Sequence, residues 1–510
     1  MSRLHFKPAA LAAASVLAVA VCAAPALAAP LARVEASSAS PGPRVARSFL
    51  GFSQEFQNVE ATIGPRGAPL NPAFLALVGR LAAYGGGTPM LRIGGGSTDL
   101  SFLADQTHSR PHGMVHAIDP GFLENVARYL QATHAPLIFG INFGLFRPGL
   151  AAAMASAVMH AMPAGSVSGL ELGNEPDTYQ HFDLYPGRRI RSGGWGPAAY
   201  TTQVLRYDRA ILGADPRAPI AGPSLIGGYL PWLQAFPTIV ARQRHVPGLV
   251  TVHQYPLLSC GRRAGTHRYV SPWELLGHPA VDGRAALLSS LASIAGRYGK
   301  RLRVTEANSV ACGGSPGASD AFASALWGAD WSFMVAAVNG SGVDFHMASA
   351  NYAPLSVGYT AAGAAALVHP LYYGMLFFAQ ATAHRARLLS DSYKQLRVRK
   401  GINLHAWATY DHVDRVVRVA IIDKDRRGRG TVVVHVPGAR GPGRLSRLAA
   451  PSVSSKQVTL GGQRFAVPTT GDLIGRPRVA DVPRRSGSRF RVSMSGPGAA
   501  LLTVPVGRLR

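Results

Sequence analysis

The chain has 510 residues and a formal net charge of +26, from 52 Lys and Arg against 26 Asp and Glu. Its hydrophobic content of 47% is ample for a large core. After the first 28 residues, no stretch holds the roughly 18 uncharged apolar residues of a membrane span. The length suits one large domain followed by a smaller one.

The positive charge is concentrated in residues 384–510, which hold 25 Lys and Arg against 7 Asp, a net +18. Such a balance favours acidic partners such as nucleic acid, anionic lipid or uronic-acid polymers. Most of the charge is arginine, which a GC-rich genome would also produce, and no nucleic-acid-binding motif accompanies it. We therefore expect neither a nucleic-acid partner nor a membrane anchor.

Residues 1–28 have the pattern of a signal peptide. Arg3 and Lys7 precede an apolar, Ala-rich run over residues 9–21, and Ala26-Leu27-Ala28 is a small-residue cleavage site. We expect cleavage near Ala28/Ala29 and secretion to the cell exterior or the periplasm.

Residues 48–383 alternate short apolar runs with longer helix-like segments. Eight such runs are present, at residues 48–55, 89–95, 135–143, 168–176, 218–224, 249–256, 302–309 and 343–349. The helix-like segments cover residues 71–84, 121–133, 198–212, 285–298 and 320–338. The alternation predicts an α/β fold, a (β/α)8 TIM barrel. A doubly wound open sheet is the alternative, but Gly94-Gly95-Gly96 lacks the spacing of its phosphate-binding turn.

Two glutamates occupy equivalent places in this series. The fourth run closes on Asn174-Glu175-Pro176, where proline cannot continue a central ladder, and the seventh closes on Glu306. In a TIM barrel both would reach the catalytic rim. Two carboxylates so placed suit glycoside hydrolysis, in which one protonates the leaving oxygen and the other attacks carbon or activates water.

The sixth run supplies His253 and Tyr255, which alternation places on the same face. A tyrosine hydroxyl near a carboxylate can orient it and favour its ionised form. Cys260 and Cys312 follow the sixth and seventh runs, which are neighbours in a barrel. Because export favours disulfides, we expect these two cysteines to form one on the rim.

Residues 384–510 change character, with short β-branched runs separated by Gly, Asp and Pro, at residues 403–410, 416–423, 431–436, 457–459 and 499–506. They predict an all-β domain, a sandwich. The lead-in, residues 29–47, could add a strand to it.

Several motifs in chain order resemble glycoside hydrolase family 79, which includes bacterial β-glucuronidases and heparanases. They are Leu91-Arg-Ile-Gly-Gly95, Gly173-Asn-Glu-Pro-Asp177, Val252-His-Gln-Tyr255, Thr305-Glu-Ala-Asn308 and Ala350-Asn-Tyr352. The family architecture is a barrel followed by a β-sandwich. The resemblance implies that Glu175 is the general acid/base and Glu306 the nucleophile of a retaining enzyme.

The resemblance also implies a sugar-binding set. Asn174 would contact the 2-hydroxyl of the sugar, Glu55 and Asp99 other hydroxyls, and Gly313, Gly314 and Tyr352 the carboxylate of a uronic acid. One departure is Cys312, where related heparanase-like enzymes can carry an aromatic residue.

Together these features predict a retaining exo-β-glucuronidase that acts on a carbohydrate containing glucuronic acid. They call for no metal and no cofactor. Two alternatives remain open: an endo-acting enzyme of heparanase or hyaluronidase type, and a non-catalytic protein whose basic sandwich binds acidic polysaccharide.

Overall fold

The computed structural model describes residues 29–37, 41–227, 230–233, 236, 248–261, 266–360 and 363–507. The predicted signal peptide, residues 1–28, lies outside these ranges. Within them, every helix is too short or too polar to span a bilayer.

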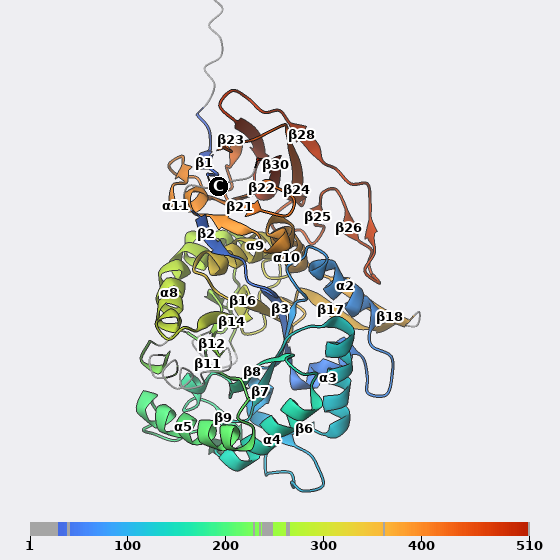
Figure 1. Ribbon diagram of the computed structural model, residues 1–510, viewed down its shortest axis with the longest axis vertical. Helices are drawn as coiled ribbons and strands as arrows, with labels where there is room; N and C mark the ends of the chain where they lie inside the picture. The colour runs from blue at the N-terminus through green and yellow to red at the C-terminus, as the bar shows by residue number, and fades with distance from the viewer. Residues whose placement is uncertain are drawn as a thin grey trace, which may run out of the picture.

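A closed barrel of eight parallel strands forms the larger domain, drawn from blue to olive in Figure 1. The strands are β3 (Leu50–Glu55), β4 (Met90–Gly94), β7 (Leu137–Ile141), β8 (Val167–Leu172), β11 (Ile220–Leu225), β12 (Leu249–Gln254), β14 (Arg301–Ala307) and β16 (Gly342–His346). Each coincides with one of the eight predicted runs. Because β16 pairs with β3 and so closes the sheet, the barrel is confirmed and the open-sheet alternative is wrong.

Helices cover the outside of the barrel. The longer ones are α2 (Pro72–Ala82), α3 (Pro120–Thr133), α4 (Pro148–Ala161), α5 (Pro197–Ala214), α8 (His278–Arg297), α9 (Phe322–Ala337) and α10 (Pro370–Ala381). Local chemistry sets their starts: the Asn71 and Asp119 side chains cap α2 and α3, and proline takes the first helical position of each. Helices α4 and α10 were not among the predicted segments.

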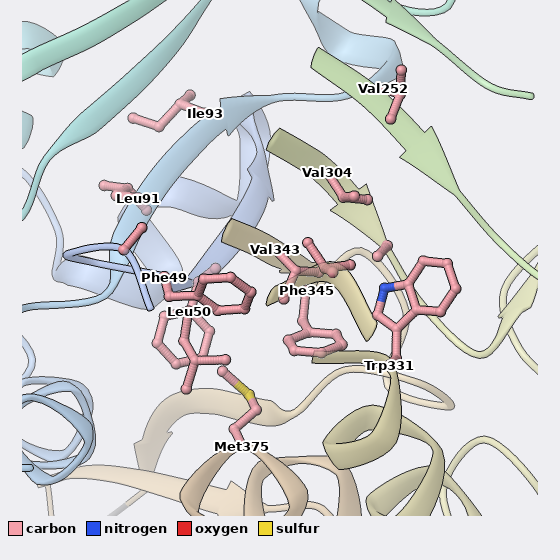
Figure 2. Packing of buried hydrophobic residues seen from close by; sticks show 14 of the residues in the cluster. Phe49, Leu50, Leu91, Ile93, Val252, Val304, Trp331, Val343, Phe345 and Met375 are labelled. Atoms are coloured by element: carbon pink, nitrogen blue, oxygen red, sulfur yellow. The ribbon is translucent and has the colours of Figure 1, made fainter. Parts of the chain in front are cut away.

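The core between strands and helices includes the buried residues around β3 and β16. Figure 2 shows Phe49, Val343 and Phe345 facing Trp331 of α9 and Met375 of α10. All five are buried. Helices α9 and α10 are apolar on nearly every side, since they lie between the barrel and the second domain.

The second domain is a sandwich of two sheets, in orange and red in Figure 1 except for the blue strands β1 and β2. One sheet has the order β20 (Arg397–Val398), β1 (Ala32–Glu35), β23 (Arg429–His435), β29 (Arg489–Ser495). The other runs β2 (Pro41–Arg44), β19 (Arg387–Leu389), β21 (Leu404–Asp411), β22 (Val416–Asp423), β30 (Gly498–Pro505), β24 (Gly443–Ala449), β25 (Thr459–Leu460). The lead-in therefore places one strand in each sheet. Strands β24 and β29 were not predicted, because arginine and serine interrupt their apolar pattern on the outward face.

A buried charged cluster joins the two domains. Asp330 of α9 accepts hydrogen bonds from Lys424 at 2.6 Å, from Trp407 at 2.8 Å and from His405 at 2.8 Å. Asp330 and Lys424 are both fully buried. Burial opposes ionisation, but His405 and Lys424 lower the pKa of Asp330 well below its usual value, and Asp330 in turn raises the pKa of His405 to about 9. The cluster fixes the sandwich against the barrel.

Replacing Asp330 with asparagine should therefore destabilise the protein strongly. The change leaves the Lys424 ammonium buried without its counter-charge, which typically costs about 3–5 kcal/mol of unfolding free energy. Urea unfolding followed by fluorescence would measure the loss. The matched control is Glu60→Gln, which removes an exposed ion pair with Arg66 worth at most about 1 kcal/mol. Equal losses in the two variants would contradict the role given to the cluster.

Candidate active site

The two predicted glutamates meet at the carboxyl ends of the barrel strands. Glu306 lies near the end of β14. Glu175 comes three residues after β8 ends and adopts a left-handed backbone, with φ 50° and ψ 53°. This conformation is uncommon for a residue other than glycine and is held by the Glu175 amide, which donates to the Ser224 carbonyl at 3.1 Å. The rim thus carries both carboxylates on different strands.

An oxygen of Glu175 and an oxygen of Glu306 lie within 4.8 Å of one another, and His253 is placed between them. The Nδ1 atom of His253 is 2.9 Å from Glu175 and 4.0 Å from Glu306. On the other side, the Tyr255 hydroxyl donates to Glu306 at 2.8 Å. His253 and Tyr255 therefore share one face, as alternation predicts, but each contacts a different glutamate.

Arg92, in the middle of β4, contacts several residues of this centre with its side chain. Its guanidinium is fully buried and lies 2.7 Å from Glu306 and 2.7 Å from Glu171 of β8. It also donates to the Asn174 side-chain oxygen at 3.2 Å and to the Ser53 hydroxyl at 3.1 Å. Asn174 is thereby oriented with its amide nitrogen left to donate elsewhere.

These contacts hold Glu306 in its ionised form. Burial alone would raise the pKa of Glu306, but His346, His253 and Arg92, together with the Tyr255 hydroxyl, lower that pKa well below its usual value. A carboxylate that is ionised, buried and oriented by a hydroxyl can act as a nucleophile or a base.

Glu55, at the end of β3, lines the same site. Its carboxylate accepts from the Gly96 amide at 3.1 Å and the Ser97 amide at 2.9 Å, and also from the Ser97 hydroxyl. His346 of β16 lies 3.6 Å from Glu55 and 3.8 Å from Glu306, so it bridges the two carboxylates. Gly95 has φ 78°, and a Cβ atom there would collide with Glu55. Gly95 of the Leu91-Arg-Ile-Gly-Gly95 motif thus makes room for the carboxylate.

Asp99 has a different environment from Glu55. It is buried, and its oxygens accept from the Phe143, Gly144 and Asn174 amides and from the Tyr179 hydroxyl at 2.6 Å. Its acceptor positions are therefore occupied within the protein, and the structure places it behind Asn174 as a support for the loop.

The predicted carboxylate-binding residues lie in the segments that follow β14 and β16. Gly313 and Gly314 have φ 85° and 87°, and within the described part of the chain neither amide donates a hydrogen bond. Tyr352 is buried, with its ring 6.3 Å from that of Tyr255 and 6.1 Å from that of His346. Directly before Gly313, a disulfide joins Cys312 to Cys260, and their Cα atoms are 5.6 Å apart.

Glu175, His253 and Glu306 are close enough together to ligate a cation. The guanidinium of Arg92 already supplies positive charge at Glu306. We therefore interpret these three residues as part of an ion-pair network.

Three residues of this centre have roles that the sequence analysis did not assign: Arg92, Glu171 and His346. The first two leave a signal in the sequence, since each is a charged residue in an otherwise apolar barrel strand. Arg303 and Asp344 leave the same signal and form a second buried pair inside the barrel, at 2.8 Å. Opposite charges in the middle of different buried strands indicate inner ion pairs.

Comparison with known proteins shows which proteins this chain is similar to. Residues 406–501 match the family model described as the glycosyl hydrolase family 79 C-terminal beta domain. The chain is also 23% identical over 436 residues to a protein of Neurospora crassa named beta-glucuronidase, an alignment that covers 77% of this chain and 74% of that protein. The C-terminal domain of the chain thus resembles that of glycosyl hydrolase family 79, and most of the chain is similar to a glucuronidase.

Solved structures of glycosidases share the fold of this chain. A 4-O-alpha-L-rhamnosyl-beta-D-glucuronidase from Fusarium oxysporum 12S superposes with a TM-score of 0.74 at 18% identity, over 92% of this chain and 100% of that one. A GH51 arabinofuranosidase from Xanthomonas axonopodis pv. citri gives a TM-score of 0.64 at 15% identity, over 93% and 99%. At these identities the likeness concerns the fold.

The Tyr255 hydroxyl should set the acidic limit of glycosidase activity. It favours the ionised form of Glu306, so Tyr255→Phe raises the pKa of Glu306 and moves the acidic limb of kcat/KM to higher pH. In the wild type, that limb should lie below pH 4.3, roughly where an ordinary glutamate protonates. A pH profile on an aryl glycoside measures the shift. Tyr298→Phe, on the opposite face of the barrel, is the control, and an unmoved limb in Tyr255→Phe would contradict the assignment.

Proposed function

We propose that the protein is a retaining exo-β-glucuronidase in which Glu306 is the nucleophile and Glu175 the general acid/base. The observation that carries this proposal is the spacing of the two carboxylates, within 4.8 Å between oxygens. Retaining glycosidases separate these groups by about 5–5.5 Å, whereas inverting enzymes leave about 6.5–9.5 Å for a water molecule. The spacing supports direct attack on the sugar.

In the first step, Glu175 gives its proton to the glycosidic oxygen and Glu306 attacks the anomeric carbon. The carbon–oxygen bond to the leaving group breaks, and the sugar becomes an ester of Glu306. In the second step, Glu175 takes a proton from water, which attacks the same carbon and releases Glu306. Because two displacements occur at one carbon, the product keeps the β configuration.

The other rim residues position the sugar for these steps. Asn174 accepts from Arg92, so its amide nitrogen is directed to the 2-hydroxyl, where hydrogen bonds strengthen in the transition state. Glu55 accepts from two amides and a hydroxyl, and these bonds orient its carboxylate to accept a further hydrogen bond from a ring hydroxyl of the sugar.

Recognition of glucuronic acid requires donors to the C6 carboxylate, because leaving that charge buried and unpaired is costly. The free amides of Gly313 and Gly314 and the Tyr352 hydroxyl supply them in this proposal. The disulfide beside these glycines keeps the donors in place and agrees with action outside the cytoplasm, after export directed by residues 1–28.

Tyr352→Phe tests the uronic-acid assignment. A hydrogen bond to a charged group is worth about 1.5–3 kcal/mol, so the change should lower kcat/KM on an aryl β-glucuronide roughly ten- to a hundredfold. The effect on the matching β-glucoside should be small, which makes the glucoside the internal control. If the wild type cleaves both substrates equally well, or if the variant leaves their ratio unchanged, the uronic-acid assignment is wrong.

A further inference from the structure

A cavity of about 230 Å³ adjoins Glu175. Among the described residues, its walls include Glu175 and Asn174 but neither Glu306, Tyr255 nor Tyr352. It therefore lies on the acid/base side of the centre and does not include Tyr352, which is proposed to bind the carboxylate of the uronic acid. Under the proposed function, the leaving group must lie against Glu175, because that residue protonates the glycosidic oxygen.

The outer wall of this cavity is the hairpin of β9 (Asp183–Tyr185) and β10 (Arg188–Arg189), which follows the Glu175 loop. Phe182 stands at its base, and its carbonyl accepts from the Ile190 amide at 3.0 Å. Tyr185 packs against His112, with ring centroids 4.6 Å apart, so the hairpin is anchored to a neighbouring loop. The Phe182 side chain is nevertheless 56% exposed. An exposed phenylalanine on an anchored hairpin beside a catalytic residue offers a stacking surface.

Apart from the Asn174 amide nitrogen, most polar side chains in the cavity wall are already paired within the protein. Asp99 accepts four hydrogen bonds, one of them from the Tyr179 hydroxyl. The Thr178 hydroxyl donates to the Glu175 carbonyl at 2.7 Å, and Asp183 pairs with Arg189 at 3.3 Å. A second sugar would therefore find few partners for its hydroxyls, and desolvated hydroxyls without partners are costly.

The rest of the wall is apolar and is formed by Leu100, Phe182, Leu184 and Ile190. Its volume is below the roughly 300–1,000 Å³ of sites for drug-sized ligands, which suits a group of one or two rings. We propose that this cavity is a leaving-group site that selects an aromatic aglycone over a second sugar. The inference rests on the proposed function and adds the class of substrate to it.

Benzyl and methyl β-glucuronide provide the test, because benzyl alcohol and methanol are leaving groups of nearly equal acidity. The wild type should favour the benzyl substrate in kcat/KM by about tenfold, the gain expected from stacking and apolar burial. Phe182→Ala should reduce that benzyl-to-methyl ratio about tenfold, and Phe182→Tyr should restore it. The matched control is Tyr298→Ala, a partly exposed aromatic residue between α8 and β14 on the opposite face of the barrel, which should leave the ratio unchanged.

Two results would overturn the inference while the proposed function stands. One is a benzyl-to-methyl ratio near one that Phe182→Ala does not alter. The other is a kcat/KM for a glucuronosyl disaccharide, whose leaving group is a sugar, that exceeds the value for the benzyl substrate. Failure of the proposed function itself is distinguishable, because the wild type would then cleave none of these glucuronides.

Discussion

The site depends on the buried guanidinium of Arg92. It lies 2.7 Å from both Glu306 and Glu171 and reaches the side chain of Asn174. Without such a cation, the buried carboxylates of Glu306 and Glu171 would lack a counter-charge, and Glu306 would take up a proton more readily. The planar guanidinium of Arg92 therefore both keeps Glu306 ionised and orients the side chain of Asn174.

The barrel makes this arrangement possible, because parallel strands bring distant parts of the chain to one rim. Arg92 comes from β4, Glu171 from β8, Glu306 from β14 and His346 from β16. The sandwich contributes indirectly. Its contact with α9 through Asp330 and Lys424 supports one side of the barrel, while the disulfide from Cys260 to Cys312 supports the rim. Rigid elements thus carry the residues that must be held within a fraction of an ångström for chemistry.

Much of the architecture could be predicted from the sequence, because apolar runs and helix-like segments alternate with the spacing of a TIM barrel. The pairing of Glu175 with Glu306 followed from their places at the ends of the fourth and seventh strands. Among the sandwich strands that escaped prediction, β24 and β29 did so because outward arginines conceal their alternation. The partners of each glutamate also could not be predicted: strand order places His253 and Tyr255 on one face, but only side-chain packing decides which glutamate each contacts. The sugar contact of Asp99 stays a prediction, while its four internal hydrogen bonds, which sequence could not predict, give it a supporting role as well.

The claim that Glu306 attacks the sugar is tested most directly by trapping the ester it would form. A 2-fluoro glucuronide with a good leaving group should be attacked but should then hydrolyse slowly, so that the intermediate accumulates. Proteolysis and mass spectrometry should recover the sugar on the peptide that contains Glu306. The fraction of that peptide that carries the sugar should equal the fraction of activity lost. Recovery of the sugar on Glu175, or an enzyme that releases α-glucuronic acid first and never carries the adduct, would contradict the account.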